Sequence, residues 1–106
     1  MMKILVTDGM DRNAINNLVN EGFEVEEKFY EEEVLKEKIK DVDVIVVRSA
    51  TKLRKNIIDE ALETGRLKLI IRGGVGLDNI DVAYAEAKGI MVRNTPGAST
   101  NAVAEL

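Results

Sequence analysis

The chain has 106 residues, of which 45% are hydrophobic and 32% charged, and its formal net charge is -4. This length gives one domain or a piece of one and excludes two. It contains neither Cys nor His, which excludes disulfides and thiolate catalysis, removes the commonest zinc ligands and the commonest general base near neutral pH, and predicts no metal site. The acidic balance argues against a nucleic-acid partner.

Hydrophobic residues are nowhere concentrated enough for a membrane segment, since no apolar run approaches the roughly 20 residues that a span needs. Residues 1–6 lead directly into a short apolar strand, without the longer apolar stretch and cleavage site of a secretory signal. We therefore expect a cytoplasmic protein that does not interact with membranes.

Five short apolar runs alternate with amphipathic stretches along the chain. The predicted strands are residues 4–6, 23–25, 44–47, 67–71 and 90–92. Several are apolar without polar alternation, which indicates burial on both faces. This alternation predicts an α/β domain with a parallel sheet.

Four helices are predicted between these strands, over residues 11–21, 31–40, 56–64 and 81–88. The second begins with glutamates and ends with lysines, which complements the helix dipole. Gly22 follows the first helix as a left-handed C-terminal cap, and Asp81 is a natural N-cap of the fourth. A fifth helix begins at residues 102–106, where the sequence ends, so we expect the chain to be a piece of a longer protein.

The loop after the third strand carries a guanidinium and two hydroxyls, from Arg48, Ser49 and Thr51. Ligands gather at the carboxyl ends of parallel strands, and these groups are suited to binding a carboxylate or phosphate. The same residues are also typical of a surface arginine followed by a helix N-cap. Both interpretations remain open on these residues alone.

The loop after the fourth strand is rich in glycine: Arg72 is followed by Gly73, Gly74, Val75 and Gly76. Glycine lets the backbone approach an anion closely and turn its N–H groups inward as a nest. A tight strand-to-helix turn would explain the same glycines, so an anion site is one of two interpretations.

These glycines do not complete a dinucleotide-binding fingerprint, because Asn79 stands where the third glycine is required. Asn94 stands at the end of the following strand, where a ribose-binding carboxylate is expected. Residues 94–96 are also common turn formers.

Taken together, residues 47–52, 72–81, 94–96 and 102–106 resemble the D-2-hydroxyacid dehydrogenase family in order and spacing, and within it the phosphoglycerate dehydrogenases. The resemblance covers essentially the whole chain. It implies a three-layer, flavodoxin-like fold with helices on both faces of a five-stranded parallel sheet. It also implies that residues 1–98 form the substrate-binding domain and that residues 99–106 start a helix linking it to a Rossmann NAD-binding domain that this chain lacks.

The resemblance also implies the roles of individual residues. Substrate contacts would come from Arg48, Ser49, Arg72, Gly73, Gly74, Val75 and Gly76. In this set Arg48 and Ser49 would contact the substrate phosphate, and the three consecutive amides starting at Gly74 would cradle the substrate carboxylate. Contacts near the nicotinamide would come from Ser99, Thr100 and Val103. Asp78, Asn79 and Asp81 would be structural.

No catalytic residue is expected in this chain, because the catalytic Arg, Glu and His of the family come later in sequence. The resemblance implies that the complete protein is a homo-oligomer that uses NAD to oxidise a small anionic 2-hydroxy acid. Within the family, the resemblance to phosphoglycerate dehydrogenases implies oxidation of 3-phosphoglycerate to 3-phosphohydroxypyruvate in serine biosynthesis. The chain alone would be inactive.

Four other functions are compatible with parts of this sequence. A glycerate, hydroxypyruvate or lactate enzyme of the same family would share the glycine turn. A response-regulator receiver would need an Asp where Arg48 stands, and a flavin-binding electron carrier would need a hydroxyl-rich phosphate cradle in place of residues 8–11. A stand-alone, non-catalytic binding domain is the remaining alternative.

Overall fold

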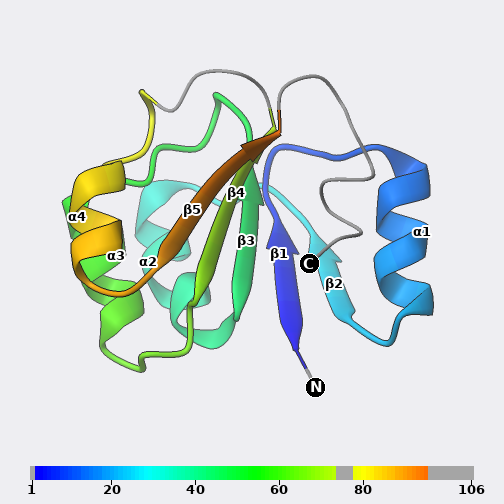
Figure 1. Cartoon of the computed structure of the whole chain (residues 1–106), viewed down its shortest axis with the longest axis horizontal. Coiled ribbons are helices and arrows are strands. Elements are labelled where there is room, and N and C mark those ends of the chain that lie inside the picture. Colours follow the sequence, from blue (N-terminus) through cyan, green and yellow to red (C-terminus); the bar gives the residue numbers. More distant parts are fainter. Residues whose placement is uncertain (1, 74–77, 96–106) are drawn as a thin grey trace.

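A five-stranded parallel sheet forms the centre of the computed structural model, which describes residues 2–73 and 78–95. The strands lie in the order β2-β1-β3-β4-β5 (Figure 1), and all four neighbouring pairs are parallel. Their bounds are β1 Lys3–Val6, β2 Glu24–Glu27, β3 Val44–Val47, β4 Leu69–Gly73 and β5 Met91–Thr95. The predicted α/β fold with five parallel strands is confirmed, and its strand order is that of flavodoxin-like sheets.

Helices cover both faces of this sheet and complete three layers. Helix α1 lies on one face, whereas α2, α3 and α4 lie on the other (Figure 1). Their bounds are α1 Arg12–Asn20, α2 Glu32–Lys38, α3 Lys55–Leu62 and α4 Val82–Ala87, and a 3-10 turn η1, Ile39–Asp41, follows α2. Across residues 2–73 and 78–95, no helix combines the length and apolarity needed to cross a membrane.

The apolar residues form two buried clusters, one on each face of the sheet. All four residues of β3 are buried and alternate between them. The larger cluster, beneath α2, α3 and α4, contains Leu5, Leu35, Ile39, Val42, Ile45, Val47, Leu53, Ile57, Ile58, Ala61, Leu67, Ile70, Ile80, Ala85, Ile90 and Val92. The smaller cluster, on the α1 face, contains Ile4, Val6, Leu18, Val44, Val46, Leu69 and Ile71. Burial on both faces explains why the central strands are continuously apolar.

Strand boundaries differ from the predicted ones in β2, β4 and β5. Strand β2 begins one residue later than predicted and extends to Glu27, because its register on β1 pairs Val6 with that glutamate. Leu67 and Ile90 were assigned to strands but precede them, and both are nevertheless buried in the larger cluster. These two side chains are apolar because they are buried, and a residue just before a strand can be buried as fully as one within it.

Of the two predicted helix caps, Gly22 after α1 is as predicted and Asp81 before α4 is so only in position. Gly22 follows α1 with φ 96°, the left-handed conformation expected of a glycine cap. Asp81 occupies the N-cap position of α4, but its side chain makes no cap hydrogen bond there. Instead its Oδ2 accepts a hydrogen bond of 2.8 Å from the main-chain N–H of Lys55, the first residue of α3. A parallel bridge between Leu53 and Ile80 brings the starts of the two helices together, so the carboxylate reaches α3.

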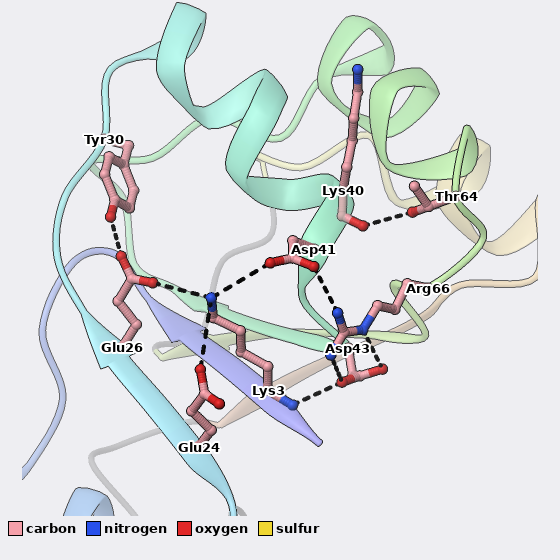
Figure 2. Close-up of polar contacts among 9 residues, drawn as sticks. All are labelled: Lys3, Glu24, Glu26, Tyr30, Lys40, Asp41, Asp43, Thr64 and Arg66. Carbon is pink, nitrogen blue, oxygen red and sulfur yellow. Dashed lines mark hydrogen bonds and ion pairs between the residues drawn. The ribbon is translucent and has the colours of Figure 1, made fainter. Parts of the chain in front are cut away.

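A network of charged residues ties the elements together at the amino ends of the strands (Figure 2). Lys3 Nζ lies 3.8 Å from Glu24, 3.5 Å from Glu26 and 3.7 Å from Asp41. Arg66, which precedes β4, pairs with Asp41 at 2.7 Å and with Asp43 at 3.3 Å. The network therefore lies at the edge of the sheet opposite to the loops that carry the candidate site.

Candidate functional site

The candidate site lies at the carboxyl ends of the strands. In a parallel sheet these ends share one edge, which is where ligands bind. Arg48 follows β3 directly, and Arg72 lies near the end of β4, paired in register with Val47 on one side and Asn94 on the other. The fold therefore brings the two loops singled out from the sequence to neighbouring positions.

Asp8, just after β1, fixes one side of the loop 48–51. Its Oδ2 accepts hydrogen bonds from the main-chain N–H groups of Arg48 at 2.7 Å and Thr51 at 2.9 Å. The Thr51 hydroxyl lies 2.7 Å from Asp8 Oδ1 and 2.8 Å from Thr7 Oγ1, and both threonines are buried. The loop is thus anchored to β1 through charge-assisted hydrogen bonds, the stronger kind.

This contact occupies a place where flavodoxin-like proteins bind ligands. In sheets of this order the ligand crevice lies between β1 and β3, where the strand order reverses. Here the carboxylate of Asp8 spans these strands and takes the N–H groups of Arg48 and Thr51 that could otherwise face a phosphate. The main-chain N–H groups of Arg48 and Thr51 are therefore not available to a phosphate.

Asn79 fixes the other side of the same loop and joins it to β4. Its side chain is only 3% exposed. Its Nδ2 donates to the main-chain oxygens of Arg48 at 2.6 Å and Thr51 at 2.7 Å, and its Oδ1 accepts from Arg72 Nε at 3.0 Å. One buried amide therefore connects both arginine-bearing segments.

The predicted substrate residues that the structure describes reach this edge in different ways. The side chains of Arg48 and Ser49 are exposed, and Arg72 is partly buried, with its Nη1 donating to the Gly73 oxygen at 3.3 Å. The other three substrate residues, Gly74, Val75 and Gly76, lie outside the described residues. So do the predicted cofactor contacts Ser99, Thr100 and Val103.

Two interpretations of the loop after β3 need correction. The Thr51 hydroxyl, considered as a ligand group, is engaged with Thr7 and Asp8 inside the protein. The hydroxyls do not cap the next helix either, because α3 begins at Lys55 and its N-cap residue is Arg54. Of the two hydroxyls in this loop, the one on Ser49 is exposed.

Sequence reasoning missed the residues that hold the site together. Asp8 was not assigned to the site, and Asn79 was predicted only to be structural. A partial signal was present for Asp8, because it directly follows an apolar strand whose carboxyl end shares one edge of a parallel sheet with residues 48–51. Among the described residues, no three His, Cys, Asp or Glu side chains gather as a metal ion would require.

Comparison with known proteins places this chain in a family. The family profile described as the D-isomer-specific 2-hydroxyacid dehydrogenase catalytic domain matches residues 4–106. The D-3-phosphoglycerate dehydrogenase of Methanocaldococcus jannaschii is 52% identical, over 100% of this chain and 20% of that protein. The hydroxypyruvate reductase of Thermotoga maritima is 50% identical, over 98% of this chain and 33% of that protein.

A solved structure agrees with the sequence relatives. The NAD+-bound 3-phosphoglycerate dehydrogenase of Entamoeba histolytica superposes with a TM-score of 0.73 at 38% identity, covering 90% of this chain and 33% of that one. The chain therefore belongs to the D-isomer-specific 2-hydroxyacid dehydrogenases, a family of oxidoreductases that act on small 2-hydroxy acids. It spans about a fifth to a third of the length of these relatives.

Proposed function

We propose that this chain is the substrate-binding part of an NAD-dependent D-2-hydroxyacid dehydrogenase whose substrate is D-3-phosphoglycerate. The observation that carries the proposal is that one buried side chain, Asn79, holds both the main chain of Arg48 and Arg72 Nε at the carboxyl edge of the sheet. Two guanidinium-bearing residues fixed side by side suit a substrate with two anionic groups, because guanidinium binds both phosphate and carboxylate well.

In this proposal the chain binds and orients the substrate. Arg48 and Ser49 contact the phosphate. The main-chain amides of Gly74, Val75 and Gly76 bind the carboxylate. Arg72 and Gly73 line the same cleft. Holding the substrate in one orientation is itself a large part of catalysis. Ser99, Thr100 and Val103 would approach the nicotinamide end of the cofactor.

The chain has no His, the commonest general base near neutral pH, so we assign removal of the proton of the substrate hydroxyl to a residue elsewhere in the complete protein. NAD, when bound, supplies the acceptor for the hydride. The glycines of this chain do not complete a dinucleotide-binding fingerprint, because Asn79 stands where the third glycine is required, so we assign the cofactor to another part of the protein. We further propose a cytoplasmic homo-oligomer working in serine biosynthesis.

A second candidate is reduction of hydroxypyruvate or glyoxylate by the same family chemistry. The 50% identity to a hydroxypyruvate reductase favours it. These substrates carry one carboxylate and no phosphate, so they would leave Arg48 without its proposed partner. A phosphorylated substrate gives Arg48 an anionic partner and is preferred for that reason.

The test is an assay of the full-length gene product that contains this chain. NADH formation would be followed with D-3-phosphoglycerate, D-glycerate and D-lactate, and NADH consumption with hydroxypyruvate and glyoxylate, each repeated with the NADP form. The proposal expects the highest kcat/KM with D-3-phosphoglycerate and NAD. A higher value with an unphosphorylated acid would support the second candidate, and inactivity with every acid would refute the dehydrogenase proposal.

A binding measurement on the 106-residue chain tests whether it binds the substrate weakly and leaves NAD to another part of the protein. Only one wall of the proposed cleft belongs to this chain, so calorimetry should detect weak or no binding of D-3-phosphoglycerate and none of NAD. Submicromolar binding of NAD would contradict the assignment of the cofactor to another part of the protein.

A further inference from the structure

The main chain of the loop 48–51 is held by side-chain hydrogen bonds from both sides. The N–H of Arg48 donates to Asp8 and its oxygen accepts from Asn79; the N–H and oxygen of Thr51 are held by the same two side chains. We call this arrangement the Asp8–Asn79 clamp. It fixes the main chain at both ends of the loop and leaves the side chains of Arg48 and Ser49 exposed.

The chemistry of the clamp requires these residue types. The Asp8 carboxylate can only accept, and it faces N–H groups. Asn79 must donate twice and accept once, which an amide does and neither a carboxylate nor an apolar side chain can do. Because a guanidinium is planar, holding Arg72 at Nε also restricts the plane of its donors.

The clamp therefore relates two cationic residues to each other. Arg48 is held at its main-chain oxygen and Arg72 at its Nε, both by Asn79, at 2.6 Å and 3.0 Å. Neither segment can shift without breaking a hydrogen bond of the buried Asn79 amide or carrying the other along, and leaving a buried polar group unpaired is costly.

We propose that Asp8 and Asn79 are positioning residues that set the placement of Arg48 relative to Arg72, and thereby the affinity for the anionic groups of the substrate. This inference rests on the proposed dehydrogenase function and deepens it. Neither residue touches the substrate; each acts through the loop 48–51, and Asn79 also acts through Arg72.

The first test is a double-mutant cycle in the full-length protein with D-3-phosphoglycerate and NAD. Asn79→Ala should raise KM on the order of ten- to a hundred-fold, as small misplacements of binding groups do, with little change in kcat. Combining it with Arg72→Ala should raise KM by clearly less than the product of the two single effects, because coupled residues are not additive. Asn16→Ala, the same change at an exposed position of α1, should leave KM unchanged.

If KM of the double variant rises by the full product of the two single effects, the inference is overturned, since Asn79 would then not act through Arg72. An unchanged KM in Asn79→Ala would overturn it as well. Either result, with an active wild type, leaves the proposed function standing, whereas a wild type inactive with every 2-hydroxy acid refutes that function.

A second variant keeps the inference testable if Asn79→Ala does not fold or the wild type does not turn over. Asn79→Asp retains the acceptor for Arg72 but places a carboxylate against the oxygens of Arg48 and Thr51. A crystal structure of the full-length variant should show the loop 48–51 displaced from Arg72 relative to the wild type. In an active protein the ratio of variant to wild-type KM should fall as pH falls, because a neutral carboxyl can donate again. An undisplaced loop would overturn the inference without reference to activity.

Discussion

The carboxylate of Asp43 binds the main chain of Lys3, a residue 40 positions away: its Oδ2 accepts a hydrogen bond of 2.7 Å from the Lys3 N–H. The Arg66 guanidinium donates to both oxygens of the same carboxylate at 3.3 Å (Figure 2). Burial alone would raise the pKa of Asp43, but these hydrogen bonds and the charge of Arg66 outweigh it and hold the pKa below its ordinary value. The starts of β1, β3 and β4 are therefore joined through one ionised group.

Acid should weaken the fold through this group. A carboxyl whose pKa is lower in the folded chain stabilises the fold above its unfolded pKa, and this contribution is lost as pH falls through the folded pKa. Since the ordinary value for Asp43 is 3.8, the loss falls below about pH 4. Asp43→Asn should lower the free energy of unfolding at pH 7 and reduce its decrease between pH 7 and pH 3.

Urea unfolding at a series of pH values measures this effect. The matched control is Asp41→Asn, because Asp41 pairs with the same Arg66 but its side chain is 68% exposed. Some acid sensitivity should remain in Asp43→Asn, since the Tyr30 hydroxyl also holds the pKa of Glu26 below its ordinary value. An unaltered pH dependence in Asp43→Asn would contradict the assigned role of this carboxylate.

Removing the Asp81 carboxylate should destabilise the start of α3, although Asp81 is the N-cap residue of α4. Asp81→Ala deletes the acceptor for the Lys55 N–H and the partner of Arg54 at 3.4 Å. Loss of such a helix-start acceptor costs about 1 kcal/mol. Asp11→Ala is the control, because Asp11 precedes α1 without a side-chain cap bond. Equal shifts of the urea midpoint in the two variants would argue against the cross-helix role.

Thr51→Val tests the buried hydroxyl at the base of the candidate site. The change keeps the shape of the side chain but leaves Thr7 and Asp8 without the hydroxyl partner, which should cost roughly 1–3 kcal/mol. Thr64→Val removes an exposed hydroxyl bonded to the Lys40 oxygen and should cost less. If denaturation shows the two variants to be equally stable, the hydroxyl of Thr51 does not support the loop.

Arg48→Ala in the full-length protein separates a phosphate contact from a structural role. Its side chain is exposed, whereas its main-chain groups are held by Asp8 and Asn79. The loop should therefore survive the substitution, and KM should rise much more for a phosphorylated substrate than for an unphosphorylated one. Steady-state kinetics with D-3-phosphoglycerate and D-glycerate make the comparison, and equal effects on both would make Arg48 structural.

Most of the fold could be predicted from the sequence because its signals are local. Continuous apolar runs such as residues 44–47 require burial on both faces, and a glycine such as Gly22 marks a helix end. The site was predictable only as two separate loops. What joins them is Asn79, whose hydrogen bonds to Thr51 and Arg48 link residues 28 and 31 positions apart. The loop 48–51 is also tied to β1 by Asp8, 43 positions from Thr51. Such pairing becomes visible only once the strand order is known.

The two faces of the sheet are unequally covered, with three of the described helices beneath one and α1 alone beneath the other. Cooperative opening units in proteins tend to follow supersecondary motifs and to separate first where buried apolar contacts are fewest. The α1–β2 unit has an edge strand that pairs only with β1, so its amides should exchange with deuterium sooner than those of β3 and β4. Arg72 belongs to β4 and Asn79 to the segment before α4, both outside that unit, so their contact should persist through fluctuations that detach α1.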